Sequence, residues 1–269
     1  MRFALVAHRS TPTNDALERA ACRGVTWERL TPTRALAELD AGDVALGRLD
    51  VLPSLDGVDE GLAALGALSA RGVLVLNGPG ALLAAHDKLL TARVLSRSRL
   101  PHPATQLARG VRPGVSLRAP AVVKPRFGSW GRGVTRCDDP DALRAALAAA
   151  AVLPWYRAHG ALVQELVPPL GHDLRVVVAA GLVVGAVTRV AAPGEWRTNV
   201  ALGATRHPIL APPREACGLA RAAAAATGAA LVGVDLLPLV DGGWTVLELN
   251  GAVELSEAYG LHGDVFAEI

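Results

Sequence analysis

Acidic and amide side chains interrupt the last two strongly apolar runs of the chain, and they constrain its fold more than any other feature. Leu231–Leu237 is apolar except for Asp235, and Trp244–Leu249 carries Glu248 just before Asn250. The Asp-Gly-Gly sequence between the runs predicts that they pair as a hairpin. Because a buried carboxylate without a partner is costly, the strand that carries Asp235 needs compensating groups beside it.

The spacing of these polar residues indicates a site for a hard cation. Period-two geometry places Glu248 and Asn250 on one face of their strand and Leu247 and Leu249 on the other. With Asp235 from the neighbouring strand, three oxygen ligands converge. Such ligands suit Mg²⁺, which takes its other ligands from water and phosphate. The alternative is a pair of ordinary strands with a polar face toward solvent, and these residues alone leave both interpretations open.

Short apolar runs alternate with amphipathic stretches through the first 76 residues. This alternation predicts a small, Rossmann-like α/β unit with a mostly parallel sheet. In such a sheet the loops that follow the strands lie at the ligand-binding edge, and here they carry Arg9 and Arg48. The predicted strands are 3–7, 25–30, 43–49 and 73–76, and the predicted helices are 13–22, 33–39 and 59–69.

The pattern changes after the Asn-Gly-Pro-Gly sequence at 77–80, which indicates a turn. Hairpins replace the alternating units in the last third of the chain, where Gly228 stops a helix. We therefore expect α/β and α+β architecture in three parts, 1–85, 86–160 and 161–269. The predicted helices are 86–97, 141–152 and 213–227, the predicted strands are 121–125, 134–137, 162–166, 231–237 and 244–249, and a hairpin from 174 to 189 turns near 180–181.

Lys124 ends an apolar run and is followed by the sequence Arg-Phe-Gly-Ser-Trp-Gly-Arg-Gly at 126–133. Backbone N–H groups and cationic side chains in this arrangement are suited to closing over phosphates. A Rossmann loop leads into a helix, whereas Val134–Cys137 predicts a strand, so we expect a glycine-rich hairpin lid. A simple turn is the alternative.

The near balance of charge argues against a nucleic-acid partner, because 27 Lys and Arg residues stand against 25 Asp and Glu, a net charge of +2. Hydrophobic residues make up 51% of the chain, but the apolar run Val176–Val187 is only 12 residues long, and a membrane-spanning helix needs about 20. Cys22, Cys137 and Cys217 are far apart and are expected to be reduced thiols. We expect a cytoplasmic protein with no membrane partner.

The order of the polar motifs resembles that of the ATP-grasp superfamily, and specifically of the RimK-type amino-acid ligases. The resemblance extends from Asn77 to Asn250, and residues 1–76 resemble the small N-terminal domain of the same group less closely. The matching motifs are Asn77-x-Pro79, Asp87-Lys88, Val123-Lys124-Pro125-x-x-Gly128-Ser129-x-Gly131-Arg132-Gly133, Gln164-Glu165, Asp173-Leu174-Arg175, Arg197-Thr198-Asn199, Asp235 and Glu248-Leu249-Asn250.

The resemblance implies an ATP-grasp fold with ATP between two α+β subdomains, and it assigns roles to the matching positions. The implied roles are phosphate contacts for Lys88 and Lys124; adenine and ribose contacts for Glu165, Leu166 and Asp173; a closing lid for Gly128, Ser129, Gly131, Arg132 and Gly133; catalytic contacts to the γ-phosphate for Arg189, Arg197 and Asn199; and ligation of two Mg²⁺ ions, with Mn²⁺ as an alternative, for Asp235, Glu248 and Asn250.

In this family a substrate carboxylate accepts the γ-phosphoryl group, and an amine then attacks the acyl phosphate to form an amide. The residues fit this chemistry because phosphoryl transfer depends on positioning and charge neutralisation rather than on an activated nucleophile. The resemblance implies two substrates: an amino acid such as glutamate, and a carboxylate-bearing peptide, carrier protein or metabolite. Glutamate ligases and the ligase that attaches 2-aminoadipate to a carrier protein have a similar pattern, and we expect a homo-oligomer.

One segment departs from the family pattern, because no Pro-Gly turn follows Asn250. In that segment Glu254 either attracts an incoming ammonium group or is a solvated residue near the C-terminal helix. Arg9 and Arg48 are further candidates for substrate contacts. Two other functions stay open: a catalytically idle nucleotide-binding or regulatory protein, and an ATP-grasp enzyme acting on a nucleotide or sugar-like substrate.

Overall fold

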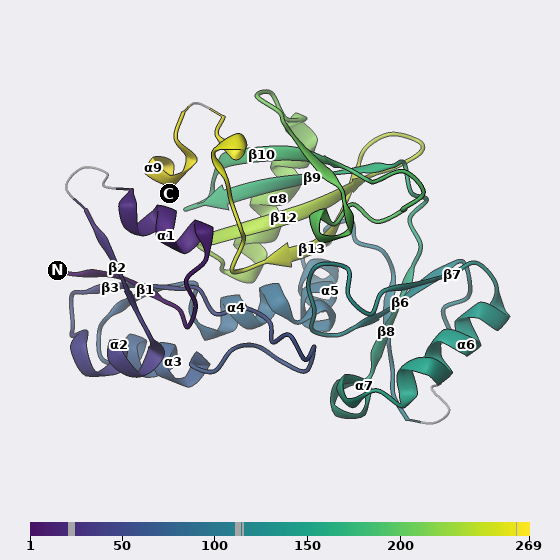
Figure 1. The fold of residues 1–269 in the computed structure, drawn as a ribbon, viewed down its shortest axis with the longest axis horizontal. Helices are drawn as coiled ribbons and strands as arrows, with labels where there is room; N and C mark the ends of the chain where they lie inside the picture. Colours follow the sequence, from purple (N-terminus) through teal and green to yellow (C-terminus); the bar gives the residue numbers. More distant parts are fainter. Residues whose placement is uncertain (21–24, 111–113, 115, 262) are drawn as a thin grey trace.

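Three β-sheets follow one another along the chain (Figure 1). The computed structural model describes residues 1–20, 25–110, 114, 116–261 and 263–269. Cys22 and the end of the helix predicted at 13–22 lie outside the described residues. Cys137 and Cys217 are free thiols, as predicted. In the described part of the chain, no helix combines the length and the apolar character needed to cross a membrane.

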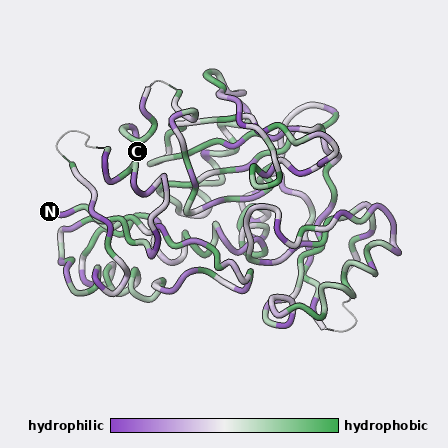
Figure 2. The backbone as a smooth tube through the Cα atoms, viewed as in Figure 1, coloured by the Kyte–Doolittle hydropathy of each residue, from purple (hydrophilic) through white to green (hydrophobic). Residues whose placement is uncertain are grey.

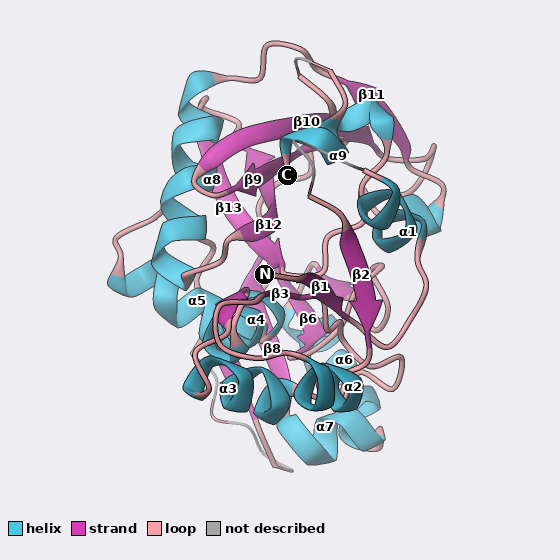
Figure 3. Cartoon of the chain, turned by 90° about the vertical axis from the view of Figure 1, so that its left-hand side faces the viewer, coloured by secondary structure: helices cyan, strands magenta, loops and turns pink. Residues whose placement is uncertain are grey.

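The first sheet is parallel throughout, with the strand order β2-β1-β3-β4. Helices α2 and α3 lie on one side of this sheet and the third sheet lies on the other (Figure 3). Alternate residues of its central strands enter different cores, since Ala4 and Val6 pack against α2 and α3 whereas Leu5 and Leu46 face the third sheet. The predicted α/β unit is confirmed. Its strands are β1 Phe3–Val6, β2 Trp27–Leu30, β3 Val44–Gly47 and β4 Leu74–Leu76, and its helices are α1 Pro12–Arg19, α2 Pro32–Glu38 and α3 Leu62–Ala70.

The predicted helix at 86–97 is wrong at its start, because two helices meet there. Helix α4 runs from Pro79 to His86, and α5 runs from Lys88 to Arg97. Asp87 between them has extended backbone angles, and its carboxylate accepts hydrogen bonds from the N–H groups of residues 89 and 90. Asp87 therefore acts as an N-cap, which a helical spacing of apolar residues does not reveal. The Pro in the predicted turn at 77–80 is the first residue of α4.

The second sheet is antiparallel, with the strand order β5-β8-β6-β7. Helices α6 and α7 cover one face of it, where Val123 and Val163 pack against Leu143 and Trp155. The alternate residues of β6 and β8, among them Lys124, line a cavity on the other face. Its elements are β5 Thr105–Ala108, β6 Ala121–Pro125, β7 Thr135–Cys137, β8 Ala161–Glu165, α6 Pro140–Ala151 and α7 Pro154–His159.

The third sheet has five antiparallel strands in the order β11-β10-β9-β12-β13. Hydrophobic residues run along its central strands (Figure 2), and α4, α5 and α8 cover one face of it. The predicted hairpin turn at 180–181 and the helix stop at Gly228 are confirmed. The elements are β9 His172–Ala179, β10 Leu182–Val190, β11 Thr205–Pro208, α8 Arg214–Thr227, β12 Leu231–Pro238, β13 Trp244–Asn250 and the C-terminal helix α9 Val265–Glu268.

The side chain of Asn77, which follows the last strand of the first sheet, forms hydrogen bonds with the backbone of the third sheet and of the segment after it. Its backbone has φ of 52°, a conformation that asparagine tolerates better than most residues. Its amide nitrogen donates to the carbonyls of Leu231 and Gly251, at 2.6 and 3.2 Å, and its amide oxygen accepts from the N–H groups of Ala230 and Leu231, at 2.7 and 3.0 Å. Asn77 is 2% exposed, and these hydrogen bonds satisfy both polar atoms of its buried amide.

Candidate active site

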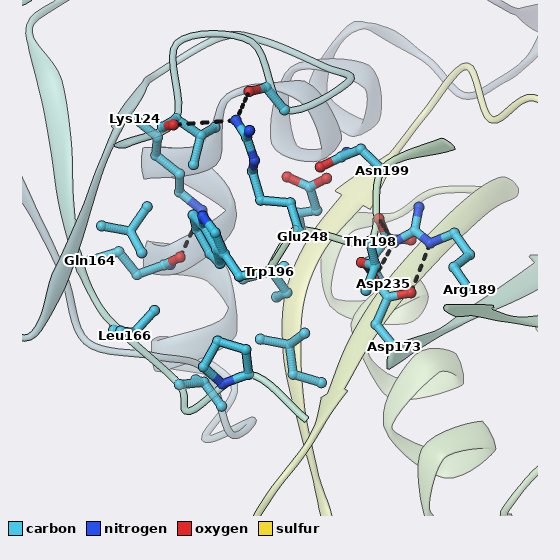
Figure 4. A pocket seen from close by; sticks show the side chains of 18 of the residues that line it. Lys124, Gln164, Leu166, Asp173, Arg189, Trp196, Thr198, Asn199, Asp235 and Glu248 are labelled. Atoms are coloured by element: carbon cyan, nitrogen blue, oxygen red, sulfur yellow. Dashed lines mark hydrogen bonds and ion pairs between the residues drawn. The ribbon is translucent and has the colours of Figure 1, made fainter. Parts of the chain in front are cut away.

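A cavity lies between the second and third sheets, and most of the residues singled out in the sequence line it (Figure 4). Lys124 and Gln164 lie on one side of it, Asp173, Arg189 and Asp235 lie on the other, and Glu248 and Asn199 lie between them. The sequence candidates that line it are Lys88, Lys124, Gly128, Ser129, Gly131, Arg132, Glu165, Leu166, Asp173, Arg189, Arg197, Asn199, Asp235 and Glu248.

Cross-strand pairing brings buried charges together on the third sheet. Arg189 lies opposite Asp173 in the β9–β10 pair, and Arg175 lies opposite Asp235 in the β9–β12 pair. Arg175 donates to both carboxylate oxygens of Asp235, at 2.6 and 2.7 Å. Arg189 forms a bidentate pair with Asp173 and also reaches Asp235 at 2.9 Å. Asp173, Arg189 and Asp235 are each less than 5% exposed, so the network compensates the buried acid that the sequence left without a partner.

The two carboxylates of this network differ in their surroundings. Burial alone would raise the pKa of Asp235, but the guanidinium groups of Arg175 and Arg189 outweigh it, and the pKa lies well below its usual range. For Asp173 burial dominates, and its pKa is raised despite Arg189 and the hydroxyl of Thr198. The matching motif in the sequence contained Arg175 but assigned it no role, although its spacing of two residues from Asp173 puts both on one face of the strand.

Glu248 lies directly opposite Asp235 in the β12–β13 pair, but the predicted alternation along β13 fails at Leu247. The register shifts after Asp235, which pairs with Glu248 while Leu236 pairs with Val246. Leu247 is the extra residue of this bulge and lines the cavity beside Glu248, whereas Val246 and Leu249 enter the core. An inserted residue reverses the faces of a strand, which explains why strict period two failed here.

Lys88 opens α5 and holds two parts of the site together. Its ammonium group lies 3.1 Å from Glu248 Oε2 and donates to the carbonyl of Gly128 in the glycine-rich segment at 2.6 Å. Arg126, at the start of this segment, pairs with Asp87, the N-cap of α5. The glycine-rich segment is thus held against the helix that presents Lys88.

The glycine-rich segment connects β6 to β7, so the predicted hairpin is confirmed. Gly131 has φ of 72°, and a Cβ there would lie 2.7 Å from Asn199 Oδ1. Arg197 donates to the carbonyl of Gly131 at 3.0 Å and is held by Glu195, and this contact lowers the pKa of Glu195 to about 2. Only a residue without a side chain allows this close approach between the glycine-rich segment and the segment that carries Arg197 and Asn199.

Apolar groups form the end of the cavity near Glu165 and Leu166. Val122, Leu237 and Leu247 line it together with the segment 166–170. Ala104 N lies 3.4 Å from Glu165 Oε2, and Leu166 N donates to Pro120 O at 3.3 Å. Trp196 also lines the cavity beside Lys124 (Figure 4), and no sequence pattern indicated it.

The donor set at the β12–β13 edge fits a hard divalent cation, because it consists of oxygen atoms. Glu248 lies opposite Asp235 in the strand pair, and Asn250 Nδ2 lies 3.4 Å from Asp235 Oδ2, although Asn250 does not line the cavity. Arg175, Arg189 and Lys88 neutralise the two acids. Within the described ranges no group of three His, Cys, Asp or Glu side chains is poised to hold a metal.

Arg9, Arg48, Glu254 and Gly133 lie outside the cavity lining. Arg9 pairs with Asp59 at 2.9 Å. Arg48 is buried and donates to Asn14 Oδ1 at 2.9 Å and to a backbone carbonyl at 3.0 Å, and it lies 3.7 Å from Glu254. Arg48 and Glu254 are therefore brought together, at the junction of the first sheet and the segment after β13.

Comparison with known proteins matches residues 85–265 to the RimK-like ATP-grasp domain. A tetrahydromethanopterin:alpha-L-glutamate ligase of Methanosarcina acetivorans is 32% identical over 73% of this chain and 66% of its own length. An alpha-aminoadipate–LysW ligase, LysX, of Saccharolobus solfataricus is 31% identical over 68% of this chain and 67% of its own. The aligned part thus spans about two thirds of each relative.

Solved structures share the fold over the whole chain. A RimK domain ATP-grasp protein of Sphaerobacter thermophilus superposes with a TM-score of 0.68 at 22% identity, covering 99% of this chain and 97% of its own. A D-alanine–D-alanine ligase of Bacillus anthracis superposes with a TM-score of 0.72 at 14% identity, covering 100% and 94%. The three-sheet architecture is therefore the ATP-grasp fold, and the chain belongs to the RimK-like ATP-grasp family.

Proposed function

We propose that the protein is an ATP-dependent carboxylate–amine ligase that forms an amide through an acyl phosphate. The observation that carries the proposal is a single cavity that brings the cations of Lys88, Lys124, Arg189 and Arg197 to the carboxylates of two paired strands. Such a site neutralises the charge that develops when a phosphoryl group moves between oxygen atoms. The family match supports this chemistry.

In the proposed reaction the γ-phosphoryl group of ATP passes to a substrate carboxylate, which yields ADP and an acyl phosphate. An amine then attacks the acyl carbon, and phosphate leaves as the amide forms. Lys88 and Lys124 bind the phosphates, and Arg189, Arg197 and Asn199 face the transferring group. Glu165 and Leu166 hold the adenine at the apolar end of the cavity, Asp173 faces the ribose, and the lid from Gly128 to Gly133 excludes water from the acyl phosphate.

ATP and a divalent cation are the cofactors that the fold implies. We assign the cation to Asp235, Glu248 and Asn250, and we propose Mg²⁺, two ions per site, with Mn²⁺ as the alternative, because oxygen donors suit both of these hard cations. When bound, the metal neutralises phosphate charge and orients the phosphates for in-line transfer. Lys88 lies 3.1 Å from Glu248 Oε2, so its ammonium group stands beside the proposed cation and the phosphates.

The substrates proposed are an amino acid such as glutamate and a carboxylate on a peptide, carrier protein or small metabolite. The named relatives support this range, since one acts on glutamate and tetrahydromethanopterin and another on aminoadipate and LysW. Arg9, Arg48 and Glu254 are proposed as substrate contacts at the junction behind the metal site. The homo-oligomer, the cytoplasmic location and the division at residues 85 and 160 stay predictions.

The proposal is tested by measuring phosphate release from Mg·ATP across a panel of amino acids and carboxylate acceptors, with mass spectrometry of the products. A new amide formed together with ADP and phosphate supports the ligase and names both substrates. Nucleotide binding with no turnover for any pair, peptide and carrier-protein acceptors included, would favour the idle nucleotide-binding protein.

Replacing Lys124 with alanine is expected to weaken nucleotide binding by roughly ten- to a hundredfold, because a buried, charge-assisted phosphate contact is lost. Burial lowers the pKa of Lys124 to about 8, although Glu248 opposes this and Lys88 adds to it. The ammonium form exists below this pKa, so nucleotide affinity should fall as the pH rises through about 8. Titration calorimetry of Mg·ADP from pH 6.5 to 9.5 measures both effects, and an unchanged affinity in the variant would remove Lys124 from the phosphate site.

A further inference from the structure

A chain of hydrogen bonds connects Lys124 to strand β13. The ammonium group of Lys124 donates to Gln164 Oε1 at 2.7 Å. Gln164 Nε2 donates to Thr105 Oγ1 at 2.8 Å and lies 3.4 Å from His102 Nε2. His102 Nδ1 in turn lies 2.8 Å from the carbonyl oxygen of Val246. These hydrogen bonds therefore connect the second sheet to the strand that carries Glu248 and Asn250.

The contact with Val246 fixes the tautomer of His102. A carbonyl oxygen only accepts hydrogen bonds, so His102 Nδ1 must carry the proton. Burial and the nearby charge of Lys124 lower the pKa of His102 to about 4, so the ring is neutral near pH 7. Its Nε2 is then an acceptor and faces the amide of Gln164.

Thr105 constrains the same amide from a second direction. Its hydroxyl has one hydrogen, and two acceptors lie within reach of it: the carbonyl oxygen of Pro103 at 2.9 Å and His102 Nε2 at 3.3 Å. Thr105 Oγ1 therefore acts as an acceptor toward Gln164. With acceptors at both His102 and Thr105, the NH₂ group of Gln164 points to them and its oxygen points to Lys124. If the amide of Gln164 were flipped, its oxygen would face two acceptors. Its NH₂ group would then face the ammonium group of Lys124.

The partner of Lys124 is neutral, and this matters for the charge of the site. Lys124 is 5% exposed, and none of the carboxylates in the described ranges lies within ion-pair distance of its Nζ. A glutamine oxygen holds the ammonium group in place without cancelling its charge. A carboxylate at the same position would pair with Lys124 and compete with phosphate for it.

We propose that Gln164 is a positioning residue that holds Lys124 toward the phosphates through an amide oriented by His102 and Thr105. This proposal rests on the phosphate-binding role given to Lys124 above. It adds a function for Gln164 and His102, and it explains why a buried amide, rather than an acid, stands beside the lysine of this site.

The test measures the affinity of a non-hydrolysable ATP analogue with Mg²⁺ by calorimetry, for Gln164→Leu in the wild-type and in the Lys124→Ala background. In the wild-type background we expect affinity to fall roughly tenfold, as for loss of a hydrogen bond to a charged group. In the Lys124→Ala background the same change should have almost no effect. An equal loss in both backgrounds would show a merely structural role and overturn the proposal.

Gln106→Leu is the matched control, because Gln106 lies on the neighbouring strand β5 and bonds Ser116 and Leu117 rather than Lys124. It should leave the affinity unchanged. Thr105→Val removes one acceptor with almost no change of shape, so it tests the network even if Gln164→Leu folds poorly. We expect it to lower affinity less than Gln164→Leu does, and again only when Lys124 is present.

Gln164→Glu gives a readout that a structural role would not produce. The new carboxylate favours the charged form of Lys124, so the loss of affinity above about pH 8 should move to higher pH. At pH 7 the affinity for the nucleotide should still be lower than in the wild type, since the new carboxylate pairs with the ammonium group of Lys124. A pH profile identical to the wild type would overturn the proposal. If Lys124→Ala alone left affinity unchanged, the phosphate role of Lys124 would fail first, which separates the two failures.

Discussion

Turnover of the Glu248→Gln variant is expected to fall by roughly a thousandfold, while its fold stays intact. The change keeps the shape of the side chain but removes the charge that lies opposite Asp235 and binds Lys88 at 3.1 Å. It therefore weakens the divalent cation where phosphoryl charge develops. ADP formation with the substrate pair found by the panel measures the effect, and circular dichroism checks the fold.

Glu257→Gln is the matched control for this change, because Glu257 is exposed and lies outside the cavity lining. It should turn over like the wild type. Raising the Mg²⁺ concentration should restore part of the activity of Glu248→Gln if metal affinity is what is lost. Wild-type turnover in Glu248→Gln would refute the metal assignment.

Replacing Arg189 with methionine is expected to lower the free energy of unfolding by about 3–5 kcal/mol, because it leaves a buried carboxylate without its partner. Asp173 is 0% exposed and depends on Arg189 for its bidentate pair, whereas Asp235 keeps Arg175. Urea denaturation followed by circular dichroism measures the change. Adding Asp173→Asn to the variant should recover part of the loss, since it removes the unpaired charge.

Arg34→Met provides the comparison for Arg189→Met. Arg34 pairs with Glu38 one helical turn away and is 61% exposed, so its loss should cost less than about 0.5 kcal/mol. If the two variants lost similar stability, the buried network would not be the source of the effect at Arg189.

Local patterns in the sequence predicted the elements that local physics determines. The hairpin turn at Ala180-Gly181 and the helix end at Gly228 follow from backbone conformations that glycine permits. The break at Asp87 and the bulge at Leu247 were missed. The first depends on a side chain that caps a helix inside an apolar pattern, and the second depends on the register with a strand from elsewhere in the chain.

In the candidate site, too, the sequence predicted features that depend on neighbouring residues but not contacts between residues far apart in the chain. The positions of Asp235 and Glu248 followed from an acid in an apolar strand and from alternation in its neighbour. Their cationic partners did not, because Arg175 and Arg189 reach Asp235 only through the order of strands in the five-stranded sheet. The orientation of Gln164 depends on a histidine 62 residues away, which a sequence pattern does not place.

The contacts of Asn77 bear on attempts to exchange pieces between members of this family. Leu5 and Leu46 share one core with Val177 and Val187, and the amide of Asn77 is satisfied only by backbone groups near residues 230 and 251. Grafting the first 76 residues onto another ligase would cut through that core and leave apolar surface on both halves. A chimera that moved this segment together with the third sheet would keep the shared core and the contacts of Asn77 intact. Recombination should therefore be tolerated best when its boundaries lie on either side of the second sheet.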